Sequence, residues 1–173
     1  MHIIIGIIAL IGGAYFWAQR ARNAAAMTSE LADVATDIYL AAKRFGFRRK
    51  VNKHPVESIE DRNLAVAGIA CAFLELGSLP TQDQRDQLHV QLQSILNVSQ
   101  SDAEEMMILG RWLVNECASP DAAITRMAKR LFKISGMEAF SDLLHILQNT
   151  LPKSWNSQQI TALNDVKLAF KIR

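Results

Sequence analysis

The sequence predicts an all-α protein, with a single N-terminal transmembrane helix followed by a compact helical bundle. Three observations carry this prediction. The N-terminus is a charge-free apolar run, apolar residues recur at helical spacing through the rest of the chain, and helix-start signals are frequent while period-2 alternation is missing. With 173 residues, 50% of them hydrophobic, the chain can supply one membrane segment and one domain of ordinary size. The net charge of +2 does not point to nucleic acid as a partner.

The N-terminal run contains no Asp, Glu, Lys or Arg over residues 1–18. As a helix it would measure about 27 Å at 1.5 Å per residue, which is close to the thickness of a bilayer core. Tyr15 and Trp17 stand where an interfacial aromatic belt is expected, and Arg20 and Arg22 follow directly. These four residues are the predicted contacts with the membrane interface.

The charge after this run predicts the orientation of the anchor. Positive residues lie on its C-terminal side, so we expect the N-terminus outside and the rest in the cytoplasm, at a bacterial inner membrane. A cleaved signal peptide is the alternative, supported by the small residues Ala24 to Ala26. Only Met1 and His2 precede the apolar core, however, where a signal peptide requires a basic region.

The predicted organisation has three parts: an anchor at 1–22, a stalk helix and basic linker at 23–57, and a helical domain at 58–173. Apolar residues at helical spacing predict the stalk helix, which stops at Gly46. The basic residues after it are candidate contacts with anionic lipid headgroups, and a solvated linker is the alternative. They are Arg48, Arg49, Lys50 and Lys53. Nucleic acid is not expected, since no matching basic face is evident in the rest of the domain.

Capping signals divide the helical domain. Capping boxes of the Ser/Thr-x-x-acid/amide type begin at Ser58, Thr81 and Ser101. Ser119 is a further N-cap candidate, because a proline follows it directly. With the intervening stop signals they predict helices near 59–76, 82–96, 102–118, 120–134, 137–150 and 157–171. The first is apolar on nearly all sides and is expected at the centre of the bundle.

An internal repeat links two of the turns. The stretch "SLPTQDQRDQL" (78–88) aligns without a gap with "TLPKSWNSQQI" (150–160), and each lies between two predicted helices. A duplicated helical hairpin would pack about a pseudo-two-fold axis.

The segments "AVAGIACAFLELGSLPTQDQRDQLHVQLQSILNVSQSDAEEM" and "FSDLLHILQNTLPKSWNSQQITALNDVKLAFKI" resemble the tellurite-resistance TerB-like domain over roughly residues 60–172. That small all-α fold also occurs in a membrane-anchored DnaJ-like cochaperone. A J domain is not indicated here, because "KHPVES" has Val56 where its His-Pro-Asp motif requires an acidic residue. The resemblance implies a helical domain with two acidic hairpin turns that are proposed to bind metal or partners.

The acidic turns of that family are degenerate in this chain, and the Asp-Gly pair is missing from both. The first turn retains only Glu75 and Asp83, with Asp86 in the next helix, whereas Ca²⁺ prefers six to eight oxygen ligands. No metal site is therefore predicted, and these three residues are the weak alternative. No cofactor is expected.

Catalytic groups are not evident in the sequence. Neither His89 nor His145 is followed, three or four residues later, by a His, Cys or carboxylate that would make a convincing ligand pair. The two cysteines, Cys71 and Cys117, lie in apolar patterns typical of buried thiols. Trp155, in the second turn, is the candidate contact with a partner protein.

The sequence therefore predicts a membrane-anchored, non-catalytic accessory subunit. It would present a cytoplasmic helical domain to a partner membrane protein complex, with the lipid bilayer as a second partner and a homo-oligomer as a further option. A metal-binding or tellurite-stress protein of the TerB type is the alternative.

Overall fold

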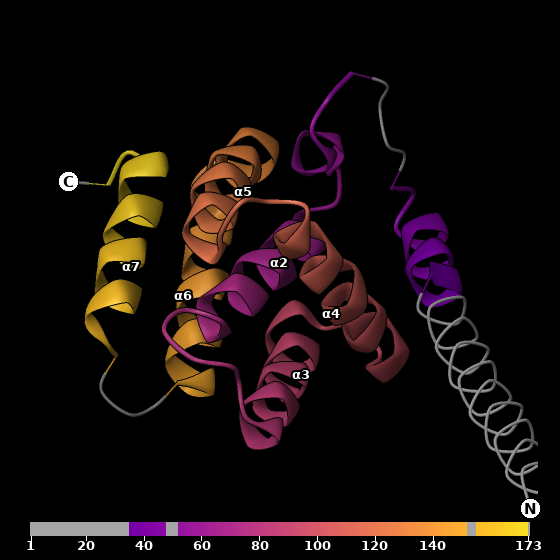
Figure 1. The fold of residues 1–173 in the computed structure, drawn as a ribbon, viewed down its shortest axis with the longest axis horizontal. Helices are drawn as coiled ribbons and strands as arrows, with labels where there is room; N and C mark the ends of the chain where they lie inside the picture. The colour runs from indigo at the N-terminus through magenta and orange to yellow at the C-terminus, as the bar shows by residue number, and fades with distance from the viewer. Residues whose placement is uncertain (1–34, 48–51, 152–154, 173) are drawn as a thin grey trace, which may run out of the picture. The chain divides into compact units, whose positions relative to one another are not determined.

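The computed structural model describes residues 35–47, 52–151 and 155–172 (Figure 1). The chain divides into two units, residues 1–37 and 38–173, and the second unit is described here. Its described part is entirely helical. After a helical segment that ends at Arg44, the elements are η1 (Pro55–Ser58), α2 (Arg62–Leu74), α3 (Gln82–Leu96), α4 (Gln100–Asn115), α5 (Pro120–Ser135), α6 (Glu138–Thr150) and α7 (Ser157–Ala169).

Helix α2 forms the centre of the bundle, as its uniformly apolar sequence predicts. Every residue from Leu64 to Leu74 is buried, because α4, α5 and α6 all pack against this helix (Figure 1). Helix α3 packs on α6, and α7 packs on α5. The single hydrophobic core therefore surrounds α2, and the other helices each bury only one face.

The helix boundaries agree with the sequence prediction where the capping residue is unambiguous. Thr81 and Gln84 form the predicted capping box of α3, and Ser119 caps α5 through the backbone N–H of Ala122. Helix α3 ends at Asn97, whose φ of 53° places it in the left-handed region. These signals are local, so they determine the helix ends without help from the tertiary structure.

Two predicted caps are wrong, and each has a competing residue nearby. Ser58 is buried in η1, and α2 is instead capped by Asp61, whose carboxylate accepts from Leu64 N at 2.7 Å. Helix α4 begins two residues before the prediction, with Ser99 as its cap. Ser101 is left to accept a hydrogen bond from Arg44 at 3.2 Å.

Residues 38–47, which precede η1, contact α4 through ion pairs. Arg44 forms ion pairs with Asp102 at 2.8 Å and Glu105 at 2.9 Å, and Ala41 is completely buried. These contacts join residues 38–47 to the bundle.

The two turns of the predicted repeat lie against each other. Asn156 caps α7 through Gln159 N, and its side-chain amide donates to Leu76 O in the first turn at 3.1 Å. Gly77 has a φ of 87°, in the left-handed region that residues with a Cβ rarely adopt, and it lies close to the side chains of Gln158 and Asn156. The hydrogen bond between Asn156 and Leu76 thus joins two turns that are 80 residues apart in the sequence.

The fold-class prediction is wrong in one part. Within residues 35–47, 52–151 and 155–172, no helix is long and apolar enough to cross a membrane. The most apolar helix, α2, has 13 residues, and α4 and α5 have 16. At 1.5 Å per residue such helices reach roughly 20–24 Å, short of a hydrocarbon core of about 30 Å. The predicted anchor, residues 1–22, with Tyr15, Trp17, Arg20 and Arg22, lies outside the described residues.

Candidate interaction groove between α3 and α4

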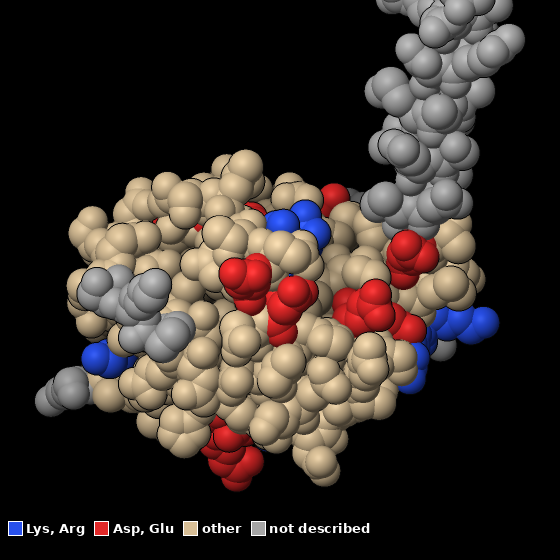
Figure 2. Space-filling model, turned by 90° about the horizontal axis from the view of Figure 1, so that it is seen from below, with Lys and Arg blue, Asp and Glu red and all other residues tan. Residues whose placement is uncertain are grey.

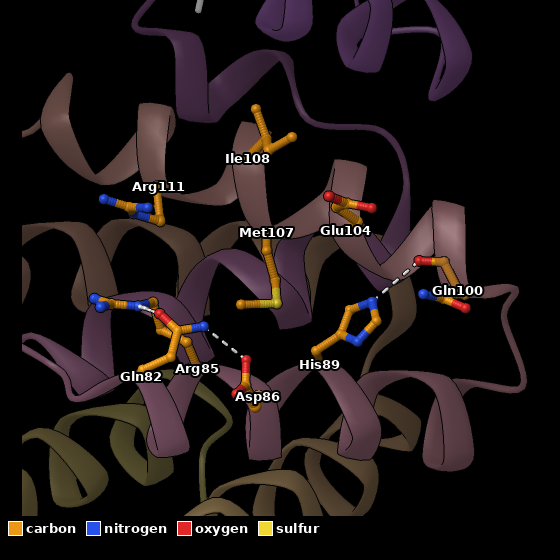
Figure 3. Close-up of a pocket in the computed structure, with 9 residues that line it drawn as sticks. All are labelled: Gln82, Arg85, Asp86, His89, Gln100, Glu104, Met107, Ile108 and Arg111. Carbon is orange, nitrogen blue, oxygen red and sulfur yellow. Dashed lines mark hydrogen bonds between the residues drawn. The ribbon is translucent and has the colours of Figure 1, made fainter.

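The acidic residues of the first turn do not come together as a metal site. Glu75 follows the last turn of α2 and is half-buried, Asp83 is exposed in the first turn of α3, and Asp86 accepts a hydrogen bond from Gln82 at 2.8 Å (Figure 3). Among the described residues, no group of three or more His, Cys, Asp and Glu side chains could hold a metal ion.

Trp155 packs against the domain. Its ring lies 6.0 Å from that of Phe73, and its indole N–H donates to Leu151 O at 3.0 Å. The structure thus gives this tryptophan a packing contact with the core. Lys53 is exposed just before η1, whereas the other three basic residues of the predicted lipid contact, residues 48–50, lie outside the described part.

A groove of about 440 Å³ with a largely polar lining lies between α3 and α4 (Figure 3). The polar face of α3 lines one side and one face of α4 the other. The lining side chains are Gln82, Arg85, Asp86, His89, Gln100, Glu104, Met107, Ile108 and Arg111. Residues 82, 85, 86 and 89 follow the i, i+3, i+4, i+7 spacing of a single helix face. The short turn from Asn97 to Ser99 connects the two helices, so these faces lie opposite each other.

Met107 lies between the two helices in the middle of the groove (Figure 3). It is partly buried and packs against the core, so its flexible thioether offers an apolar surface that can adapt to different side chains. Ile108, next to it on α4, is also only partly buried. The groove therefore combines an apolar centre with a polar rim.

The two ends of the groove differ in charge. Arg85 and Arg111 lie on one side of Met107, and Glu104 lies on the other together with His89 (Figure 3). Arg85 is held in place, since its guanidinium donates to Pro80 O at 2.9 Å. Arg111 is exposed and makes no hydrogen bond or ion pair with another residue in the described part of the chain. One end is therefore suited to a carboxylate.

His89 is fully engaged at the opposite end. The Gln93 amide lies 3.2 Å from its Nδ1. Its Nε2 lies 3.1 Å from Gln100 O (Figure 3). An amide N–H can only donate and a carbonyl can only accept, so Nδ1 accepts and Nε2 carries the proton. The ring thus ties α3 to the start of α4 and supports the shape of the groove.

Cys71 lies behind the groove, on α2. Its thiol donates weakly to Met107 O at 3.9 Å. Complete burial raises the pKa of this thiol to about 12, reinforced by the nearby Glu75 carboxylate and opposed by Arg111. Burial also raises the pKa of Glu75, and Arg111 again opposes the change. At neutral pH Cys71 is a protonated packing residue, as its apolar sequence context predicts.

Cys117 contacts His54 but is not activated by it. Its Sγ lies 4.0 Å from His54 Nε2 and 3.4 Å from Leu113 O. His54 Nδ1 accepts from Val56 N, so Nε2 carries the proton and donates to Glu116 O at 3.1 Å. Partial burial raises the pKa of the Cys117 thiol. This pair joins η1 to the end of α4.

The sequence pattern did not reveal the groove. The buried face of α4 contains Met106 and Leu109, whereas the neighbouring Met107, Ile108 and Arg111 line the groove. The sequence does contain a signal for this groove. The polar faces of α3 and α4 carry charged residues at helical spacing, and a very short turn joins the two helices. Only the angle between the helices decides whether such faces close or remain open.

Comparison with known proteins does not add a family. No protein-family model matches this chain, and neither a curated protein nor a solved structure is significantly similar to it. The resemblance to the TerB-like domain therefore stays a prediction based on the sequence motifs.

Proposed function

We propose that this helical domain is a non-catalytic interaction module that binds a segment of a partner protein in the α3–α4 groove. The observation that carries the proposal is the composition of the groove. An adaptable apolar centre at Met107 lies beside the exposed guanidinium of Arg111, which makes no hydrogen bond or ion pair within the described residues. A segment that presents one apolar side chain and a carboxylate would complement both.

The state of the titratable side chains around the groove supports binding over catalysis. Both ring nitrogens of His89 are used in hydrogen bonds that hold the helices, and Cys71 is completely buried with a strongly raised pKa. A general base or nucleophile must reach the substrate with a free lone pair. His89 and Cys71, the side chains best placed to react, are thus hydrogen-bonded and buried, respectively.

Site-specific photo-cross-linking in the organism that encodes the protein tests this proposal. A photoreactive residue replaces Ile108 in the full chain, and the matched control replaces Leu168, an aliphatic residue on α7 that is 71% exposed. We expect a discrete adduct from position 108 that is not formed from position 168. Arg111→Glu should abolish it, because the reversed charge repels the partner's carboxylate.

The partner identified from the adduct is then purified and its binding to the full chain is measured. A synthetic peptide of its cross-linked segment should compete for binding to the wild-type chain and fail to bind Arg111→Glu. Equal adducts from positions 108 and 168, or adducts unaffected by Arg111→Glu, would show that the groove is not the binding site.

A further inference from the structure

A second surface, on α5, carries four basic side chains on one face, so the expectation that the domain has no basic face is wrong. Arg126, Lys129, Arg130 and Lys133 line a shallow groove of about 570 Å³ together with Glu57 from η1. Their i, i+3, i+4, i+7 spacing places them within about 10 Å along the helix axis. Such a concentration of like charge costs stability unless an anion compensates for it.

The groove already binds one carboxylate. Glu57 accepts a hydrogen bond from Arg126 at 3.1 Å, and both side chains are about half exposed, at 51% and 45%. Arg130 is held by its Nε, which donates to Ile59 O at 2.6 Å and leaves the other guanidinium nitrogens for a ligand. Lys129 and Lys133 are exposed and have no hydrogen bond or ion pair with any described residue. The internal ion pair thus satisfies one cation of four.

The surroundings limit the kind of anion that fits. Glu57 borders the groove, and Asp121 is exposed at the start of α5, so the positive surface is short and has acidic neighbours. On another face of the domain, seen from below in Figure 2, acidic side chains predominate among the charged ones, so the positive surface does not extend there. An extended duplex or a flat anionic membrane would meet these carboxylates, whereas a short acidic segment would meet only the basic face. The lining residues include no aromatic side chain on which a nucleic-acid base could stack.

We propose that the basic face of α5 binds a carboxylate-rich segment of a partner protein, which displaces Glu57 from Arg126 and pairs with Lys129 and Lys133. This surface is separate from the α3–α4 groove, because the two share no lining residue. The acidic segment binds mainly through charge, so its affinity falls as the salt concentration rises.

The test measures binding of a short fluorescent peptide of paired glutamates and alanines to the full chain at an ionic strength of about 0.1 M, where the Debye length is about 10 Å. Lys129→Glu/Lys133→Glu should weaken binding by about tenfold, because two ion pairs are replaced by repulsion. The matched control, Lys43→Glu/Lys167→Glu, changes the net charge equally at two lysines that do not line this groove. It should stay within about twofold of wild type, since charges beyond a Debye length are screened.

Glu57→Gln gives a result of the opposite sign. Removing the internal competitor frees Arg126, so the peptide should bind about two- to threefold more tightly than to wild type. A purely structural role of the Glu57–Arg126 pair would not produce this gain.

The same chain is titrated with the glutamine version of the peptide, with duplex DNA and with phosphatidylcholine vesicles that contain phosphatidylserine. Weaker binding of all three supports the proposal. Tighter binding of DNA or vesicles than of the acidic peptide would overturn it, and so would equal weakening by the two double variants. Arg111→Glu, the groove variant, should leave peptide binding unchanged, so failure of one proposal is distinguishable from failure of the other.

Discussion

Gly68 on α2 and Gly110 on α4 bring the backbones of two helices into direct contact. A Cβ at Gly110 would lie 3.1 Å from Gly68 Cα and 3.3 Å from Gly68 N. Both glycines are buried, and the nearest neighbours of a Cβ at Gly110 would be backbone atoms of α2, which cannot rotate away. This crossing allows α4 to lie close to the central helix.

Gly110→Ala should therefore destabilise the protein, although alanine favours helix formation by about 1 kcal/mol over glycine. Overpacking at a close backbone contact costs about 1–3 kcal/mol, so after the helix-propensity gain we expect a net loss of up to about 2 kcal/mol in the free energy of unfolding. Chemical denaturation measures it. Ser94→Ala, at an exposed position of α3, is the control and should be neutral or slightly stabilising. A gain in stability for Gly110→Ala would mean that the helices do not approach as described.

Asn156 has two roles that substitutions can separate. Its Oδ1 caps α7 and its Nδ2 donates to Leu76 O. Asn156→Asp keeps the cap but loses the donor, so it should cost about 1 kcal/mol. Asn156→Ala loses both and should cost about 2 kcal/mol. Thermal or chemical unfolding measures the loss of stability of each variant and shows which loss is larger. Thr81→Ala, which removes the cap of α3, is the matched control for a cap without a cross-turn bond. Equal losses for Asn156→Asp and Asn156→Ala would refute the bond between the turns.

The raised pKa of Cys71 predicts a loss of stability at alkaline pH. The folded state holds the thiol proton up to a pKa of about 12, whereas the ordinary value is 9.0. The contribution is therefore complete below about pH 9 and decreases between pH 9 and 12, with a slope of at most about 1.4 kcal/mol per pH unit. The unfolding free energy of wild type minus that of Cys71→Ala isolates this group from other titrations. A difference that stays constant across this window would contradict the burial of the thiol.

Labelling of the native protein provides an independent check on the same thiol. Cys117 is only partly buried, so a thiol reagent at mildly alkaline pH should modify it before Cys71. Cys71 should react at a rate limited by opening of the core. Equally fast labelling of both residues would show that α2 is accessible.

Addition of Ca²⁺ or Zn²⁺ at millimolar concentration should leave the melting temperature of the protein unchanged. Glu75, Asp83 and Asp86 do not come together, and a ligand raises stability only if it binds the native state. Differential scanning fluorimetry after treatment with a chelator makes the measurement. A concentration-dependent rise that Asp83→Asn/Asp86→Asn abolishes would instead establish a metal site in the first turn.

Local chemistry in the sequence was sufficient to place the helices. The capping box of Thr81 and Gln84, the Ser119-Pro120 start and the left-handed Asn97 act within a few residues, so they are legible without tertiary information. The all-apolar composition of α2 also predicted its central place. Where two caps competed, as Ser99 and Ser101 do, the pattern alone could not choose between them.

The surfaces that could bind partners were decided by the tertiary structure. The α3–α4 groove depends on how far two polar helix faces separate, and the basic face of α5 becomes a groove only because η1 packs beside it. Among the described residues no helix is long and apolar enough to span a membrane, and the predicted transmembrane segment, residues 1–22, lies outside them. Helix positions follow from interactions between near neighbours in the sequence, whereas the grooves follow from helix crossings such as that of Gly68 and Gly110, which involve residues far apart in the chain.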